Sequence, residues 1–305
     1  MFSPLSIGVR LAIFGLLLSS ALFVHYRGRV RLKFLRQLTD HSTFTAPYNA
    51  LVYLFSAVPN RPMLDAKTFP EVEVLAKNWE MIRDEGLALM GEQRIAAATG
   101  HNDVGFHTFF KRGWKRFYLK WYHHPIPSAA AHCPKTTALL DTLPTVHGAM
   151  FTLLPPGGKI GKHRDPFAGS VRYHLGLSTP NDDKCWIEVD GNRASWRDGQ
   201  GFMFDETYVH EALNGADSRR LILFCDVERP VRWPFRGINR WMIAHVMGAT
   251  GAPNEEGEQV GALNRFFERI YGVMESGKKL KAKNRRLYYA IKYSLIVAIL
   301  ALIII

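Results

Sequence analysis

Residues 151–180 read FTLLPPGGKIGKHRDPFAGSVRYHLGLSTP. Two short runs rich in apolar residues, at 149–154 and 171–178, lie on either side of a Pro-Pro-Gly-Gly turn at 155–158. Apolar runs of this length that are bounded by proline and glycine predict β-strands. This part of the chain therefore indicates a β-rich core.

The same pattern continues as far as residue 227. Four further strands are predicted, at 185–189, 201–205, 208–213 and 220–227. Evenly spaced strands joined by Asp-Gly and Asn-Gly turns predict a jelly roll or barrel. Residues 41–145 are predicted to be mainly helix and loop, with a helix at 71–94, and helices return at 234–248 and 258–276. The predicted fold class is therefore mainly β with flanking helices.

The net charge of the chain lies entirely at its two ends. The 305 residues include 39 Lys plus Arg and 27 Asp plus Glu, a formal charge of +12. Residues 1–40 carry six basic residues and one acidic residue, and residues 276–305 carry seven basic residues and no acidic one. The neutral region between them argues against nucleic acid as a partner, because a polyanion requires a basic face.

Each basic end also contains an apolar segment that is long enough for a membrane helix. Residues 5–25 and 287–305 are each interrupted by a single charge, Arg10 and Lys292, and about 20 residues cross the hydrocarbon core. A cleaved signal peptide is the alternative for the first segment, but its basic residues follow the apolar run, and no clear cleavage site is present. We therefore expect transmembrane helices at 5–25 and 287–305.

The basic clusters also predict the orientation of the chain. Positively charged flanks stay on the cytoplasmic side of a membrane, and both clusters border the region between the apolar segments. We therefore expect a protein of the inner (cytoplasmic) membrane. Its folded domain, at 41–245 with a β core at 148–230, would face the cytosol, followed by a linker and basic amphipathic region at 246–286. Three widely spaced cysteines offer no disulfide framework, which suits a reducing compartment.

Three residues of the β region have the chemistry of a metal site. His163 and Asp165 form an H-x-D pair after the Pro-Gly turn, and His210 follows 45 residues later. Positions i and i+2 of a strand share a face, and two imidazoles with one carboxylate are the ligand set of non-haem Fe(II) oxygenases. One rival H-x-D pair, His101 and Asp103, has no comparable arginine partner.

Basic residues in the same β region as His163, Asp165 and His210 strengthen the prediction of a metal site. Arg220 begins a predicted strand ten residues after His210, and an arginine in such a place can bind a dicarboxylate through a bidentate contact. Arg172 and His174 share the face of the 171–178 strand that is opposite to its apolar side chains. Two such groups are costly in an ordinary core; a solvated outer sheet face is the alternative.

Six stretches of the sequence resemble the aspartyl/asparaginyl β-hydroxylase family. They are FPEVEVLAKNWEMIRDE (69–85), CPKTTALL (133–140), FTLLPPGGKIGKHRDPF (151–167), VRYHLGLSTP (171–180), FMFDETYVHEALN (202–214) and RRLILFCDVERP (219–230). The resemblance covers residues 65–235. It implies an oxygenase that depends on Fe(II) and 2-oxoglutarate and has a double-stranded β-helix (jelly roll) as its catalytic domain.

The resemblance also implies roles for single residues. It places iron on His163 and His210. It places the 2-oxoglutarate co-substrate in a pocket formed by Arg172, His174, Arg220, Thr152 and Trp114. The family's protein hydroxylases have glycine at the position of Asp165, so this residue either completes the ligand set or lies near the metal without binding it. We expect that it binds.

The expected activity is hydroxylation of an acyl chain of a membrane lipid, with O2 and 2-oxoglutarate consumed at Fe(II). The resemblance and the two apolar ends imply lipid A as the substrate, hydroxylated at the 2-position of a secondary acyl chain. Lys159, Lys162 and Arg164 flank the ligands and offer cations for phosphate groups, although a solvated loop explains them equally well. Two alternatives stay open: a protein aspartyl/asparaginyl β-hydroxylase, and a non-catalytic, membrane-tethered jelly-roll binding module.

Overall fold

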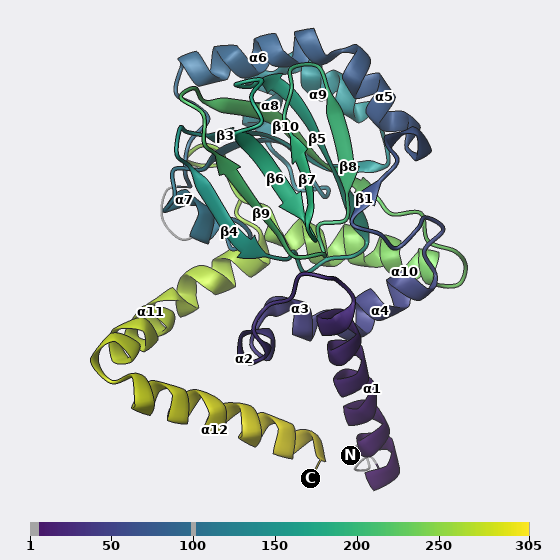
Figure 1. The fold of residues 1–305 in the computed structure, drawn as a ribbon, viewed down its shortest axis with the longest axis vertical. Helices are drawn as coiled ribbons and strands as arrows, with labels where there is room; N and C mark the ends of the chain where they lie inside the picture. Colours follow the sequence, from purple (N-terminus) through teal and green to yellow (C-terminus); the bar gives the residue numbers. More distant parts are fainter. Residues whose placement is uncertain (1–5, 99–101, 305) are drawn as a thin grey trace.

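The strands of the chain build two facing antiparallel sheets (Figure 1). The computed structural model describes residues 6–98 and 102–304. Within those ranges the six-stranded sheet has, in spatial order, β1 (Met63–Leu64), β8 (Gly201–Phe204), β5 (Ser170–Ser178), β10 (Arg220–Glu228), β3 (Val146–Leu154) and β2 (Lys115–Trp121). The four-stranded sheet has, again among the described residues, β4 (Lys159–His163), β9 (His210–Asn214), β6 (Cys185–Val189) and β7 (Asn192–Ser195). The predicted jelly-roll-like β core is confirmed.

Four strands, β1, β2, β4 and β7, are not among those that the sequence pattern predicts. Residues 41–145 are mainly helix and loop as predicted, but β1 and β2 also lie there, and Arg116 and Lys120 interrupt the apolar residues of β2. β4 and β7 are the two edges of the four-stranded sheet. Their side chains are mostly polar and accessible, so an apolar pattern does not reveal them.

Helices cover the outer face of the six-stranded sheet. They are α5 (Pro70–Lys77), α6 (Trp79–Gly91), α8 (Pro127–His132) and α9 (Pro134–Asp141). The apolar sides of α5 and α6 pack with the outward side chains of the sheet in one buried cluster. Gly86 lies so close to the sheet that an added Cβ would meet the Phe151 ring at 3.1 Å. The single helix predicted at 71–94 is divided at Asn78, whose side chain donates to the Val74 carbonyl (2.8 Å).

The side chains of strand β5 alternate between its two faces, as the sequence pattern predicts. Tyr173 and Leu175 belong to the cluster beneath the helices. Arg172 and His174 point between the two sheets, where both are buried. The alternative of a solvated outer face is therefore wrong, and the interior between the sheets contains a pocket with basic groups.

Helix α1 (Ile7–Tyr26) leaves the domain at one end of the sheets (Figure 1). The helix has 20 residues, of which an 18-residue stretch has a mean hydropathy of 2.1 and is mostly exposed, so α1 is a candidate membrane span by length and composition. In the part of the chain that the structure describes, it is the one helix that meets these criteria. α12 (Arg285–Ile304) forms a helix over the second predicted segment, and its crossing of a membrane stays a prediction.

Short helices surround the base of α1. They are α2 (Phe34–Gln37), α3 (His41–Phe44), α4 (Ala46–Leu54) and α10 (Phe235–Met242). α11 (Ala262–Lys283) leads away from the domain, and α12 turns back toward α1 (Figure 1). A hydrogen bond from Lys292 Nζ to Thr39 Oγ1 (2.9 Å) joins α12 to this basal region.

A buried ion-pair cluster, which we call the anchor junction, fixes the segment after α1 to the domain. Arg27 Nη2 lies 2.5 Å from Asp205 Oδ2, and its guanidinium group packs over the rings of Tyr53 and Tyr208. Arg229 Nη2 lies 2.8 Å from the same oxygen of Asp205, which is fully buried. The junction therefore joins the end of the candidate span rigidly to the β core.

Removing the charge of Asp205 is expected to destabilise the domain strongly. Burial favours protonation of this carboxyl, but Arg229 and Arg27 outweigh that effect and hold the pKa of Asp205 below its ordinary value. Asp205→Asn leaves two buried guanidinium groups without a counter-charge, and breaking a buried pair in this way costs about 3–5 kcal/mol. Thermal unfolding of the detergent-solubilised chain at pH 7 measures the loss.

Asp84→Asn is the matched control, because it removes an exposed carboxylate that pairs with Arg83. Its expected effect is below about 1 kcal/mol. Because the folded-state pKa of Asp205 is depressed, its contribution is present above the unfolded-state pKa of about 3.9 and is lost as the pH falls further. The gap between wild type and Asp205→Asn should therefore shrink in acid. Equal Tm values at pH 7 would contradict the role of the junction.

Candidate functional site

Strands β4 and β9 bring two of the predicted ligands side by side. His163 ends β4 and pairs across the sheet with His210, which begins β9. The two ring centroids are 4.1 Å apart. Asp165 lies in the loop just after β4, and one ligand atom from each of the three residues lies within 4.8 Å of the others. The structure therefore brings the predicted His-Asp-His cluster together.

Backbone hydrogen bonds orient both imidazoles. The Nδ1 atom of His163 lies 2.8 Å from the Gly161 carbonyl oxygen, and Nδ1 of His210 lies 2.9 Å from the Tyr208 carbonyl oxygen. A carbonyl only accepts, so each Nδ1 carries the proton and each Nε2 keeps its lone pair. This outer-shell pattern is typical of metal-binding histidines.

The electrostatics of the pocket keep the two histidines neutral. Burial lowers the pKa of His163 to about 3. Burial likewise lowers the pKa of His210. Neutral imidazoles are the form that binds a metal ion, so both side chains are ready to act as ligands at physiological pH.

Asp165 supplies a negative charge at the same place. Its Oδ1 lies 3.7 Å from His163 Nε2, and its other carboxylate oxygen accepts a hydrogen bond from Arg172 Nη1. Burial favours the protonated acid, but the positive charge and the hydrogen bond of Arg172 outweigh burial and lower the pKa of Asp165 below its ordinary value. The carboxylate is therefore ionised, with one oxygen toward the histidines and one held by an arginine.

This donor set fits ferrous iron. Two neutral nitrogen donors and one carboxylate oxygen on one side of a cavity leave further coordination positions free for small ligands, as in the two-histidine, one-carboxylate triad. The two backbone-bonded imidazoles and the arginine-held carboxylate are already oriented without an ion. Among the described residues, His163, Asp165 and His210 are the one cluster of this kind.

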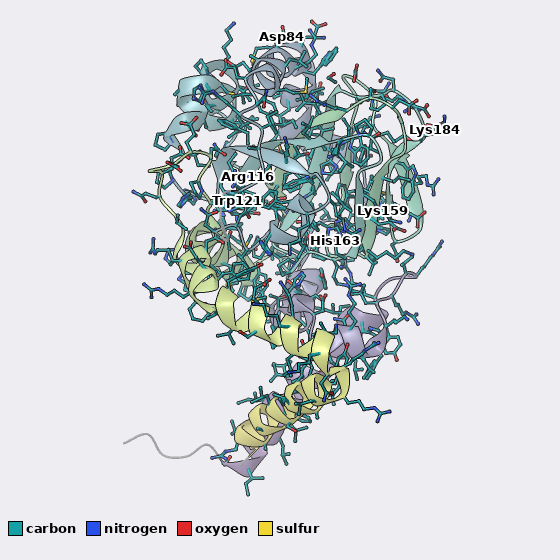
Figure 2. The ribbon with its side chains drawn as sticks, turned by 90° about the vertical axis from the view of Figure 1, so that its left-hand side faces the viewer. Asp84, Arg116, Trp121, Lys159, His163 and Lys184 are labelled. Atoms are coloured by element: carbon teal, nitrogen blue, oxygen red, sulfur yellow. The ribbon has the colours of Figure 1, made fainter. Side chains whose placement is uncertain are left out.

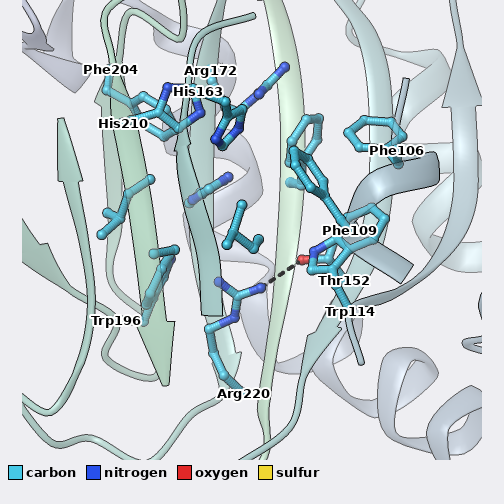
Figure 3. A pocket seen from close by; sticks show the side chains of 15 residues that line it. Phe106, Phe109, Trp114, Thr152, His163, Arg172, Trp196, Phe204, His210 and Arg220 are labelled. Carbon is cyan, nitrogen blue, oxygen red and sulfur yellow. Dashed lines mark hydrogen bonds between the residues drawn. The ribbon is translucent and has the colours of Figure 1, made fainter. Parts of the chain in front are cut away.

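A single pocket between the sheets holds the remaining predicted residues (Figure 3). Its walls include two of the ligands and five predicted co-substrate residues: His163, His210, Arg172, His174, Arg220, Thr152 and Trp114. Phe106 and Phe109 add apolar surface. In Figure 3 the histidines lie toward one end of the pocket and Arg220 toward the other.

Arg220 is a buried cation without a counter-charge. Its side chain is 2% exposed, and no carboxylate in the described part of the chain forms an ion pair with it. Nη2 donates to Thr152 Oγ1 (3.2 Å, dashed in Figure 3), Nε has no partner among the described residues, and the guanidinium stacks on Trp196 at 4.3 Å. Burial lowers the pKa of Arg220 to about 10. An uncompensated buried charge is costly, so this end of the pocket is suited to an anion.

His174 lies between the two arginines of the pocket and is neutral. Burial, followed by the charges of Arg220 and Arg172, lowers its pKa well below the ordinary value. Neither of its ring nitrogens has a hydrogen-bond partner among the described residues. A buried polar group normally has a partner, so His174 can bind a polar ligand of the pocket.

Arg172 is held by carboxylates of the protein itself. Its Nε and Nη2 donate to Asp226 Oδ1 (3.0 and 2.9 Å), its Nη1 donates to Asp165, and its guanidinium lies over the Phe224 ring. Arg172 therefore lines the pocket as predicted, but these three donors are already engaged. It orients Asp165, and its predicted contact with a carboxylate of the co-substrate stays a prediction.

Asp226 and Trp196 contact the two arginines of the pocket but are not among the residues predicted for the site. Asp226 is the single acidic residue in the strand 220–227 and pairs across the sheet with Arg172. An isolated acidic residue in an apolar strand suggests a buried partner of opposite charge. The pairing of the two strands identifies that partner as Arg172. Trp196 stands before a turn, and its contact with Arg220 follows only from the packing of the two sheets.

The rival pair and the flanking cations have other roles. Asp103 forms a buried ion pair with Arg116 (3.0 Å), and His101 lies outside the described residues. Lys159 and Lys162 are both exposed and each lies 3.6 Å from a carboxylate oxygen of Glu211. Arg164 is instead buried and donates to the Val24 carbonyl of α1 (2.6 Å). It is therefore a link to α1 and offers no charge at the pocket opening.

The fold and the site together define a class of protein. It is a β-sandwich with a jelly-roll-like core, and the pocket between its sheets contains a His-Asp-His cluster and a buried arginine without a counter-charge. The chain belongs to the aspartyl/asparaginyl beta-hydroxylase family, because the sequence model of that family matches residues 76–230. The resemblance noted in the sequence is thereby confirmed.

Two relatives illustrate the range of this family. An ornithine lipid ester-linked acyl 2-hydroxylase of Rhizobium tropici is 31% identical over 194 residues, which cover 63% of this chain and 69% of that protein. The human aspartyl/asparaginyl beta-hydroxylase is 30% identical over 168 residues, or 53% of this chain and 22% of the human protein. Among solved structures, a prolyl-4-hydroxylase of Pseudomonas putida aligns with 51% of this chain and 88% of its own, at 21% identity and a TM-score of 0.33.

Proposed function

We propose that the chain is an Fe(II)- and 2-oxoglutarate-dependent dioxygenase that hydroxylates an acyl chain of a membrane lipid. The observation that carries the proposal is the pocket itself: a three-ligand metal cluster opens on a cavity that also contains Arg220, a buried arginine without a counter-charge. A dicarboxylate in this cavity would bind the metal at one end and supply the missing counter-charge of Arg220 at the other.

Each side chain of the site has a role in the proposed reaction. His163, Asp165 and His210 would hold the iron. Arg220 and Thr152 would bind the distal carboxylate of 2-oxoglutarate, because a guanidinium group and a hydroxyl there are already directed into the pocket. When bound, iron and 2-oxoglutarate supply the oxidising chemistry that inserts one oxygen atom of O2 into a C–H bond and yields succinate and CO2.

The protein's own contribution is orientation and exclusion of water. His174 offers two unpartnered ring nitrogens to the bound co-substrate, and Arg172 keeps Asp165 ionised and aimed at the histidines. Trp114, Phe106 and Phe109 form apolar walls near the ligands. A dry, shaped cavity limits side reactions of a reactive intermediate with solvent, so these walls serve the chemistry as well as the packing.

Asp165→Ala tests whether the carboxylate binds the metal. If it is a ligand, Fe(II) affinity should fall by at least about 10–100-fold, the range found when only an outer-shell partner is lost. Titration of the metal-free protein with Fe(II) under anaerobic conditions measures this directly. Asp226→Asn is the control, since it disturbs Arg172 without removing a ligand. Equal iron affinity of Asp165→Ala and wild type would show that two histidines suffice.

Two observations support a lipid substrate. The Rhizobium relative is by name an acyl 2-hydroxylase of ornithine lipid, and α1 is a candidate membrane span. Lipid A, hydroxylated at the 2-position of a secondary acyl chain, is the substrate we propose. Ornithine lipid presents an amino-acid headgroup instead of phosphates. Purified protein is given each lipid in turn, and the lipid whose mass rises by one oxygen atom is the substrate.

We also propose the location that the charge pattern predicts: the inner membrane, with the domain in the cytosol and 287–305 as a second span. The alternative substrate, an Asp or Asn residue of a protein, is favoured by the match to the human enzyme. A peptide panel assayed beside the lipids separates the two. A non-catalytic binding module is disfavoured, because a buried Arg220 without a counter-charge has no purpose in an inert core.

A further inference from the structure

The large exposed apolar side chains are confined to the helices at one end of the molecule. Between residues 56 and 230, Val104 is the one such side chain among the described residues that is exposed. All others lie on α1, on the segment that follows it up to Leu54, or beyond Trp233. Large exposed apolar side chains gathered on neighbouring helices in this way are typical of a face that contacts a partner or a membrane.

We use the name basal collar for six of these residues outside α1, α11 and α12. They are Leu35, Phe44, Leu54, Trp233, Ile238 and Trp241. They belong to α2, α3, α4 and α10 or precede α10 directly, and these helices surround the point where α1 leaves the domain (Figure 1). Their exposure is high, reaching 77% for Phe44 and 86% for Trp233.

The orientation of α10 is fixed by buried polar contacts. Asn239 is buried; its Oδ1 accepts from the Tyr48 hydroxyl (2.5 Å), and its Nδ2 donates to the Gly169 carbonyl (3.1 Å). These contacts hold the opposite face of the helix outward, with Ile238 and Trp241 one turn apart. The exposure of Ile238 and Trp241 is therefore built into the fold.

Charge complementarity identifies the partner as an anionic lipid surface. Residues 27–55 contain five Arg or Lys residues and one acid, and residues 231–250 contain three and none. Cations such as Arg29, Lys33 and Arg236 are exposed between the apolar side chains. Tryptophan and arginine interspersed with aliphatic groups suit the headgroup layer, and each basic residue near an anionic leaflet contributes about 1 kcal/mol.

The collar is continuous with α1, and it adjoins the loop that carries the proposed metal ligands. Arg164 donates to the Val24 carbonyl (2.6 Å), and Arg36 Nη2 donates to the Lys162 carbonyl (3.0 Å). His163 and Asp165 are the part-exposed end of the pocket, with side chains 17% and 20% exposed. In Figure 2, His163 lies on the α11 side of the domain and Asp84 at the opposite end.

We propose that the basal collar rests in the headgroup layer of the bilayer that α1 enters, so that the His163 end of the pocket opens toward the lipid. The docking itself does not depend on catalysis. The consequence that an acyl chain reaches the pocket directly from the membrane rests on the proposed function.

Fluorescence quenching by lipids tests the docking. The three native cysteines are buried, so the full chain can be labelled selectively with an environment-sensitive dye in Trp241→Cys, Ile238→Cys and Asp84→Cys. Each variant is inserted into phosphatidylcholine/phosphatidylglycerol vesicles whose lipids carry a nitroxide near the headgroup. Labels at 241 and 238 should be quenched several-fold more than the label at 84, which serves as the control in the same anchored protein.

Two results would overturn the proposal. One is quenching at 241 and 238 no greater than at 84. The other is protection from nitroxide combined with cysteine cross-links between copies at 241, which would mean that a second copy of the chain covers the collar. Because the readout needs neither iron nor substrate, loss of lipid hydroxylation in the wild-type chain would count against the proposed function alone.

Discussion

His210→Ala is expected to abolish hydroxylation, with a fall in turnover of more than about 100-fold. The substitution removes one of two neutral imidazoles from a three-ligand cluster, and loss of an outer-shell partner alone costs 10–100-fold. Succinate formation at saturating 2-oxoglutarate measures turnover, and anaerobic Fe(II) titration of the same variant shows whether the metal is still bound.

His132→Ala is the matched control for this substitution. His132 pairs with Glu255 at the surface, outside the pocket, so its loss should leave iron affinity and turnover within about twofold of wild type, the scale of a surface pair. If His210→Ala kept wild-type iron affinity and turnover, the assignment of the cluster as the metal centre would be wrong.

Arg220→Ala is expected to raise the 2-oxoglutarate requirement sharply while the iron site stays intact. A hydrogen bond to a charged group contributes about 1.5–3 kcal/mol, so the KM for 2-oxoglutarate should rise by about 10–150-fold, since each 1.4 kcal/mol is tenfold. The guanidinium lies in the pocket but is not among the cluster residues, so Fe(II) affinity should not change. Steady-state kinetics against 2-oxoglutarate measure the effect.

Two further variants sharpen this test. Arg220→Lys keeps the charge but loses the planar fork and its stacking on Trp196, so its KM should lie between those of wild type and Arg220→Ala. Arg193→Ala removes an exposed arginine that stacks on Trp186 instead, and its KM should equal that of wild type. A wild-type KM in Arg220→Ala would remove this residue from the co-substrate site.

The β core was accessible from the sequence where apolar runs are bounded by turn residues, as they are in β3, β5 and β10. Alternation in the 171–178 stretch predicts that Arg172 and His174 point away from the apolar side chains, and the structure confirms it. β2 carries basic residues among its apolar ones, and β4 and β7 are polar edges. Such strands show no period of two, so their existence follows only from the pairing of neighbouring strands.

The residues of the candidate site were predictable from the sequence, but their contacts with other residues were not. His163, Asp165 and His210 carry the chemistry in their side chains, so a pattern search finds them. The engagement of Arg172 by Asp226 depends on strand register. The anchor junction depends on contacts across 178 residues, from Arg27 to Asp205, and no local pattern specifies a contact over that distance.

In the proposed function, this pocket oxidises a lipid at the expense of 2-oxoglutarate. The most direct measurement supplies the purified full-length chain with Fe(II), 2-oxoglutarate, 18O2 and lipid A in mixed vesicles, and follows lipid mass and succinate together. We predict one 18O atom on an acyl chain for each succinate formed, with neither product in His210→Ala. Succinate without labelled lipid, or label only on an Asp- or Asn-containing peptide, would contradict the account.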